Sequence, residues 1–188
     1  NSATLYADDG LAESDTSFQS GTVSMEIDNA DLDTQSTLLG HTVSNGVKDN
    51  NAIFMADSSV SLNLTAKNNG SIKIYDNING TSGYTVALDG DETGAIYLNN
   101  DIKNANVTLD NTNVYLGRED VFDQSLSLTT NSGTISMVNN SIGTMNVPEF
   151  NLVGNTNIAV DVDLANETMD RIDADNYYIN NGAKLNVE

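Results

Sequence analysis

Two aspartates toward the C-terminal end of the sequence have the spacing that paired-carboxylate chemistry requires. Asp161 and Asp163 are two residues apart in the alternating run of residues 157–164, so we expect one strand to carry both carboxylates on one face. Such a pair can serve as acid and base in glycoside hydrolysis, and some parallel β-helix enzymes cleave acidic polysaccharides in this way. The solvent face of an amphipathic strand has the same composition, and no cluster of Lys and Arg accompanies the pair to hold an acidic sugar. The sequence therefore favours a solvent-facing strand over a catalytic site.

Two further candidates for site chemistry lack the partners that their chemistry needs. Residues 89–92 (Asp-Gly-Asp-Glu) form an acidic turn that can offer oxygen atoms to Ca²⁺, but the third ligand and the distal Glu of an EF-hand are missing. His41 is the only histidine in a chain without cysteine, so it cannot form a usual zinc site. No Gly-x-Ser-x-Gly elbow accompanies it for a Ser-His-Asp triad. We predict no catalytic residue, no metal site and no cofactor.

Tyrosines are the remaining candidates for contact with a ligand. Tyr97 and Tyr115 each stand between two aliphatic residues of an alternating segment, so we expect both side chains to point outward. A tyrosine ring can stack on a sugar, whereas the plain alternative is a strand face whose hydroxyl groups lie in water. We take Tyr97 and Tyr115 as candidate ligand-binding residues.

The elements that position these residues follow from a short repeating pattern. A hydrophobic–x–hydrophobic couplet recurs, and the segments between couplets are rich in Asn, Gly, Asp, Ser and Thr. The spacing of two puts both side chains of a couplet on one face of a strand. Short strands with polar turns and no long helix predict a stacked, one-dimensional β architecture. The couplets are Leu62/Leu64, Ile72/Ile74, Val86/Leu88, Ile96/Leu98, Val107/Leu109, Val114/Leu116, Leu126/Leu128, Ile135/Met137, Met145/Val147, Phe150/Leu152 and Ile158/Val160.

Asparagine supports the same architecture and also leaves a rival fold open. The chain of 188 residues contains 28 Asn, a residue that favours turns because it tolerates positive φ and bonds its own backbone. At equivalent turns of a parallel solenoid, Asn side chains can also stack into hydrogen-bonded ladders. Asn-Gly pairs, as at residues 69–70 and 79–80, are strong hairpin signals as well. We therefore predict an all-β parallel β-helix, with an antiparallel β-sandwich as the alternative.

Charge and composition limit the partners of the chain. Its 27 acidic and 7 basic residues give a formal net charge of −20, which disfavours nucleic acid and an anionic membrane surface. The absence of cysteine excludes disulfides and thiolate metal sites. No stretch approaches the ~20 apolar residues of a membrane helix. We expect a monomer that binds no nucleic acid and does not itself insert into a membrane.

The pattern divides the chain into two regions. Residues 1–50 are irregular coils that can belong to the same solenoid, with a strand predicted at residues 23–27 and a short helix at residues 30–39. Residues 51–188 form the parallel β-helix. Within it, residues 165–172 form a helical turn or an outward loop before the final strands.

Several segments of the second region resemble autotransporter passenger domains. These are residues 94–102 (GAIYLNNDI), 126–128, 132–137, 150–157 (FNLVGNTN), 161–166 (DVDLAN) and 169–172. The resemblance covers roughly residues 50–188. It lies in the general character and spacing of these segments and includes no catalytic signature. It implies a right-handed parallel β-helix that is secreted through an outer membrane and displayed on, or released from, a bacterial surface. The membrane β-barrel of that family is expected elsewhere in the full-length chain.

We therefore expect an adhesin or structural stalk that acts by multivalent binding of glycans or host cell-surface proteins. One alternative is a β-helix polysaccharide lyase or glycoside hydrolase. Another is a spacer that binds nothing.

Overall fold

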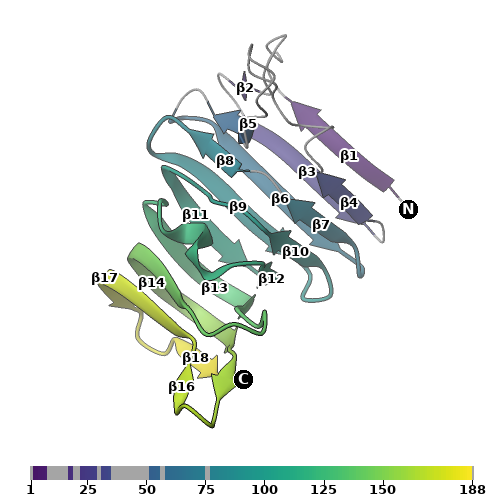
Figure 1. Cartoon of the computed structure of the whole chain (residues 1–188). Helices are drawn as coiled ribbons and strands as arrows, with labels where there is room; N and C mark the ends of the chain where they lie inside the picture. Colours follow the sequence, from purple (N-terminus) through teal and green to yellow (C-terminus); the bar gives the residue numbers. More distant parts are fainter. Residues whose placement is uncertain are drawn as a thin grey trace, which may run out of the picture.

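Short strands joined by turns build the described part of the chain, which comprises residues 2–7, 17–18, 22–28, 31–34, 51–55, 58–74 and 77–187 of the computed structural model. Successive coils stack along one axis, with the N-terminus at one end of the stack and the C-terminus at the other (Figure 1). A 3-10 helix, η1 (Glu119–Phe122), is the one helical element within these ranges. The predicted all-β fold is confirmed.

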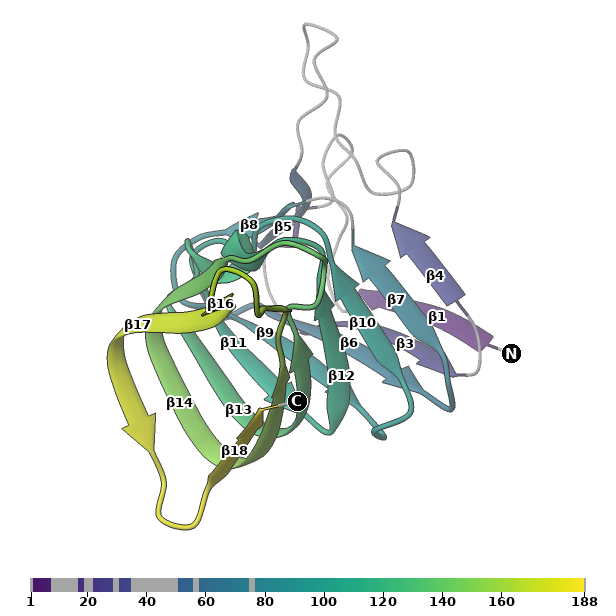
Figure 2. The same cartoon turned by 60° about the horizontal axis from the view of Figure 1, so that its bottom comes forward.

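Each coil has three sides, which follow one another in the same order along the chain. Figure 2 shows the strands of the first and second sides as two rows. The first side contains β3 (Thr22–Asp28), β6 (Ser61–Lys67), β9 (Tyr84–Gly90), β11 (Ala105–Asp110), the first half of β13 (Ser127–Ser136), the middle of β14 (Thr144–Ala159) and the end of β17 (Arg171–Ile179). The second side contains β4 (Asp31–Thr34), β7 (Ser71–Ile74), β10 (Ala95–Leu98), β12 (Thr112–Leu116), the second half of β13, the end of β14 and β18 (Lys184–Val187).

The third side has the least continuous strand pairing, because it includes a single bridge and a 3-10 helix. Residues 101–103 join it through a single bridge between Ile78 and Ile102, and the next coil continues it with the hydrogen bond from Ile102 N–H to the Val121 carbonyl. It contains β2 (Ser17–Phe18), β5 (Asn51–Met55), β8 (Asn77–Gly80), residues 101–103, η1 and the first residues of β14 and β17.

The direction of strand pairing decides between the two predicted folds. All described pairings between successive coils on the three sides are parallel. Antiparallel pairing among the described strands is confined to β1 (Ser2–Ala7), which pairs with β3, and to the small hairpin of β15 (Val162–Asp163) and β16 (Thr168–Met169). The parallel β-helix is thus confirmed, and the antiparallel sandwich is wrong.

The register of the parallel strands places like residues on top of one another. On the first side, Val86 pairs with Val107 and Val107 with Leu128; on the second, Ile96 pairs with Val114. These side chains are buried in the interior of the solenoid, as predicted from the couplets. Full burial of such an aliphatic side chain contributes about 1.5–3 kcal/mol, so the stacked rows are the main source of stability.

Two details of the predicted strands are wrong. Leu126 is exposed because β13 begins at Ser127, and the inward pair of that strand is Leu128 and Thr130. The alternating run of residues 157–164 is not one strand, because β14 ends at Ala159 and the chain then leaves the stack to form the β15–β16 hairpin. Residues 165–172 accordingly contain the turn and second strand of this hairpin, which is the outward-loop alternative.

Asparagine performs both roles predicted for it at the corners of the coils. Among the described residues, five Asn adopt positive φ, at positions 68, 69, 104, 111 and 140. Asn side chains also donate hydrogen bonds to the preceding coil: Asn104 Nδ2 lies 3.2 Å from Asn79 Oδ1, and Asn106 Nδ2 lies 3.2 Å from the Gly83 carbonyl oxygen. These amides replace main-chain pairing where the backbone turns away from the strand direction.

One corner of the longest strand depends on a glycine. β14 contains an extra residue between its pairs Thr130/Leu152 and Ser132/Asn155, which is a β-bulge at the corner between the first and second sides. A Cβ atom on Gly154 would lie 1.9 Å from the Asn131 carbonyl oxygen. Only glycine allows the two coils to approach this closely.

The described strands of residues 1–50 lie in the same sheets as the later coils. β3 includes the predicted strand at residues 23–27 and pairs in parallel with β6, and β4 pairs in parallel with β7. The helix predicted at residues 30–39 is wrong for residues 31–34, which form β4. The other residues of that segment, and His41, lie outside the described residues.

Replacing an inward leucine should cost far more stability than replacing an outward one. We expect Leu109→Ala to lower the free energy of unfolding by about 2–5 kcal/mol, because it opens a cavity between two coils. Leu164→Ala is the matched control, because Leu164 is 86% exposed in the hairpin turn, and its effect should stay within about 0.5 kcal/mol. Urea unfolding followed by far-ultraviolet circular dichroism measures both. Equal losses would contradict the inward position of Leu109.

Candidate functional site

A stack of outward side chains on the second side is the first candidate site. Parallel register places Lys73 of β7, Tyr97 of β10 and Tyr115 of β12 beside one another, and we call these three residues the aromatic ladder. The rings of Tyr97 and Tyr115 are stacked, with centroids 4.8 Å apart and planes inclined by 16°. Lys73 Nζ lies 5.8 Å from the centroid of the Tyr97 ring, within reach of a cation–π interaction.

This geometry confirms the predicted outward direction of both tyrosines and changes the chemistry that they can offer. The two rings cover one face of each other, so the ladder presents ring edges and phenol hydroxyls, and Tyr115 is 38% exposed. Hydroxyl groups can donate to and accept from the hydroxyls of a sugar or the amides of a protein. Stacking also restricts both side chains to one orientation, which lowers the entropy lost on binding.

Asparagine side chains beside the aromatic ladder hydrogen-bond each coil to the preceding one. Asn113, two residues before Tyr115 on the same face of β12, donates through Nδ2 to the Glu92 carbonyl at 2.7 Å and the Gly94 carbonyl at 3.2 Å. Asn99, two residues after Tyr97, donates through Nδ2 to the Ile74 carbonyl at 3.4 Å. Each amide therefore links its coil to the preceding one beside the ladder.

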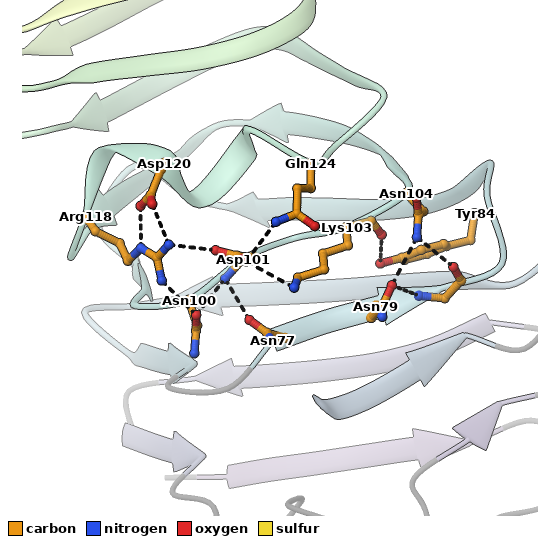
Figure 3. A network of polar contacts seen from close by, with 11 residues as sticks. Asn77, Asn79, Tyr84, Asn100, Asp101, Lys103, Asn104, Arg118, Asp120 and Gln124 are labelled. Carbon is orange, nitrogen blue, oxygen red and sulfur yellow. Dashed lines mark hydrogen bonds and ion pairs between the residues drawn. The ribbon is translucent and has the colours of Figure 1, made fainter. Parts of the chain in front are cut away.

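A polar cluster on the third side is the second candidate, and sequence reasoning missed it (Figure 3). Its centre is Asp101, which is 8% exposed. Asp101 Oδ1 lies 3.1 Å from Arg118 Nη2 as an ion pair without a hydrogen bond, and Oδ2 lies 3.2 Å from Lys103 Nζ. Gln124 Nε2 donates to Oδ2 at 3.4 Å. One feature of the sequence could have pointed to this cluster: Lys103 and Arg118 are two of only 7 basic residues, and both lie near acidic residues.

The contacts of Arg118 show that the cluster connects neighbouring coils. Its guanidinium donates to both Asp120 carboxylate oxygens and, at 3.0 Å, to Asn100 Oδ1 of the preceding coil. The hydrogen bond to Asp120 raises the pKa of Arg118 and lowers the pKa of Asp120. Nearby Asp123 has a raised pKa because burial disfavours its charged form. Both cations are paired with carboxylates, so the cluster joins coils where the third side has only a single bridge.

Tyr84 closes the cluster from inside the solenoid. The side chain is fully buried, and its hydroxyl donates to the Lys103 carbonyl at 2.8 Å. Burial raises the pKa of Tyr84, so the phenol stays protonated and remains a donor. This hydrogen bond satisfies a main-chain carbonyl next to the single-bridge strand of residues 101–103.

The two carboxylates considered for catalysis are engaged in separate structural contacts. Asp161 Oδ2 accepts hydrogen bonds from the N–H groups of Asn139 and Asn140 at 2.8 and 2.7 Å. Within the hairpin turn, Asp163 accepts from the Asn166 side-chain amide at 2.7 Å and from the N–H of Ala165 at 2.9 Å, and these hydrogen bonds lower the pKa of Asp163. The prediction that both share one strand face is wrong, because Asp161 lies between β14 and β15 and belongs to neither strand.

The acidic turn predicted at residues 89–92 begins later than expected, because Asp89 and Gly90 end β9 and, of these residues, only Asp91 and Glu92 lie between β9 and β10. Asp91 accepts hydrogen bonds from the N–H of Asn68 at 2.9 Å and from Thr93 Oγ1 at 2.7 Å. These bonds lower the pKa of Asp91 to about 2, because they favour the charged carboxylate. Within the described ranges, no group of three or more His, Asp and Glu side chains is arranged to hold a metal ion.

These observations define the class of protein: a parallel β-solenoid with an outward aromatic ladder on its second side. Comparisons with protein-family models, curated proteins and solved structures found no match. In the part of the chain that the structure describes, no helix is long and apolar enough to cross a membrane.

The Tyr84 hydrogen bond can be tested with a pair of matched substitutions. We expect Tyr84→Phe to lower the free energy of unfolding by about 1–3 kcal/mol, because the Lys103 carbonyl loses a buried donor. Tyr115→Phe removes a hydroxyl that points outward and should stay within about 0.5 kcal/mol. Chemical denaturation of the two variants and the parent chain provides the comparison. An unchanged free energy of unfolding for Tyr84→Phe would show that this hydrogen bond does not stabilise the third side.

Proposed function

We propose that this chain is a secreted, non-catalytic β-solenoid segment, displayed at a bacterial surface in the manner of an autotransporter passenger, that binds glycans or surface proteins. The aromatic ladder is the observation that carries the proposal. Tyr97 and Tyr115 are held in one orientation on a continuous sheet, and Tyr115 stays exposed. Tyrosine combines large contact area with few rotatable bonds, which suits recognition at modest entropic cost.

The solenoid supports this proposal through its rigidity. Each outward side chain has a fixed place because parallel register relates it to its counterpart one coil away. A weak contact at one place becomes useful when several copies of the protein meet a repetitive surface, since linked contacts act through effective concentration. A glycan coat is such a surface.

The energetics of the stack support the secretion part of the proposal. Each coil buries its apolar residues against neighbouring coils, so folding can propagate from one end of the stack. A chain that emerges unfolded at a cell surface can be drawn outward by such folding. The absence of cysteine is compatible with this route, because no premature disulfide can trap the chain.

Substitutions in the aromatic ladder test the proposed binding site. A glycan array followed by calorimetry should identify a saccharide that the parent chain binds, and Tyr115→Ala should weaken that binding about tenfold or more because ring contact and hydroxyl are both lost. Tyr97→Ala should weaken it as well, because Tyr115 loses the ring on which it is stacked.

Tyr178→Ala is the matched control, because Tyr178 is 54% exposed on β17 and lies outside the ladder. It should leave the affinity unchanged. An equal loss in the control variant would contradict a site at the ladder. Absence of any glycan or cell binding by the parent chain would instead favour the alternative that this segment is a spacer that binds nothing.

A further inference from the structure

Four Asn-Gly pairs occur in the sequence, and in each of them the side-chain amide lies next to a main-chain nitrogen that can react with it. Glycine has no Cβ atom to shield its own nitrogen, so this nitrogen can approach the Cγ atom of the asparagine before it. Residues 69–70, 79–80 and 181–182 belong to the described part of the chain, whereas residues 45–46 lie outside it. The three described pairs have different hydrogen bonds.

In the pair at residues 69–70, the glycine nitrogen closes a turn. The turn comprises residues 67–70, and the Gly70 N–H donates to the Lys67 carbonyl at 2.8 Å. Asn69 has a positive φ of 62°, and its own N–H donates to Thr93 Oγ1 at 3.1 Å. Gly70 is buried, so its N–H group cannot be deprotonated by solvent unless the turn opens. This asparagine is exposed, yet its neighbouring nitrogen is not available.

The pair at residues 79–80 belongs to a strand, because it ends β8, which pairs in parallel with β5. The Gly80 N–H donates to Asn79 Oδ1 at 2.8 Å, and Asn104 Nδ2 donates to the same oxygen at 3.2 Å. A nitrogen that directs its hydrogen at the amide oxygen is not oriented to attack the amide carbon. Two donors thus hold the Asn79 side chain in an unreactive position.

The pair at residues 181–182 differs because its glycine lies at the centre of a turn. Residues 180–183 form this turn, which is closed by the Ala183 N–H donating to the Asn180 carbonyl at 3.0 Å. The N–H of the third residue in such a turn, here Gly182, takes no part in the closing hydrogen bond. Gly182 has a φ of 88°, and a Cβ atom built on it would meet nothing within 4 Å. Figure 2 shows this connection between β17 and β18 projecting from the stack.

We propose that Asn181 is a site of spontaneous deamidation, whereas Asn69 and Asn79 are protected by the hydrogen bonds of the glycines that follow them. The Gly182 nitrogen attacks Asn181 Cγ and forms a new C–N bond, the bond from Cγ to Nδ2 breaks, and the proton of the glycine nitrogen leaves with the amide as ammonia. Water then opens the resulting succinimide: its hydroxyl joins one carbonyl carbon and its other hydrogen returns to the nitrogen. The products are aspartate and isoaspartate, and the reaction requires no oxidant or cofactor.

Peptide mapping of the folded 188-residue chain measures each site separately. Cleavage by trypsin after Lys and Arg places the three pairs in the peptides 68–73, 74–103 and 172–184. Each deamidation adds about 1 Da, and fragment spectra assign it to one asparagine. During incubation at mildly alkaline pH, Asn181 should deamidate at least about tenfold faster than Asn69 and Asn79, because the latter two sites react only when their hydrogen bonds open.

Two controls separate the geometry of the turns from the effect of the Asn-Gly sequence itself. In concentrated urea, where the chain is unfolded, the three sites should deamidate at rates within about threefold of one another, since their hydrogen bonds are lost. In the folded chain, Gly182→Ala should slow the reaction at Asn181 about tenfold or more, because a Cβ atom hinders the approach of the nitrogen. Circular dichroism checks that this variant folds.

Two outcomes would overturn the inference. The first is deamidation of Asn69 or Asn79 in the folded chain as fast as that of Asn181. The second is an absence of product at Asn181 in the folded chain during a time in which the urea-unfolded chain reacts there. Neither outcome depends on the aromatic ladder, so the proposed function and this inference fail separately.

Discussion

Parallel pairing in register between successive coils is the interaction on which the rest of the structure depends. It places Val86, Val107 and Leu128 in one buried row, and the same periodicity places Tyr97 beside Tyr115 on the outside. A shift of one residue on any side would exchange the two faces and bury polar side chains. The core and the aromatic ladder are therefore two consequences of one constraint.

The corners and the third side show how polar groups are satisfied where this pairing is weakest. Asn amides donate to carbonyls of the preceding coil, and Asp101 pairs with Lys103 and Arg118 beside a single-bridge strand. Asp161 and Asp170 likewise accept main-chain N–H groups of the loop before β14. In a chain with a formal net charge of −20, these carboxylates accept hydrogen bonds that hold the backbone of the loops.

Much of the stack could be predicted from the sequence, because burial at alternate positions is a local pattern. Couplets such as Leu62/Leu64 gave both the strand and its inward face, and Asn-rich segments marked the turns. Pairing direction could not be derived from couplets alone, since the same alternation suits an antiparallel sheet. The structure resolves it because β6, β9 and β11 are parallel.

The candidate sites were harder to predict for the same physical reason. The outward direction of Tyr97 and Tyr115 followed from alternation, but their stacking depends on the two residues being register partners on neighbouring coils. The Asp101 cluster joins residues of several coils, and the departure of the chain after Ala159 interrupts an alternation that looked continuous. Contacts between coils carry no local signal.

The most direct measurement of the register is cross-linking in this naturally cysteine-free chain. Thr108 and Thr129 are outward register partners on β11 and β13, whereas Ser127 is the partner of Asn106. Under mild oxidation, the Thr108→Cys/Thr129→Cys variant should form an intrachain disulfide, because paired strands lie about 4.8 Å apart. The Thr108→Cys/Ser127→Cys variant, offset by two residues, should remain reduced. Equal or preferential cross-linking of the offset pair would contradict the parallel register on which both the core and the aromatic ladder depend.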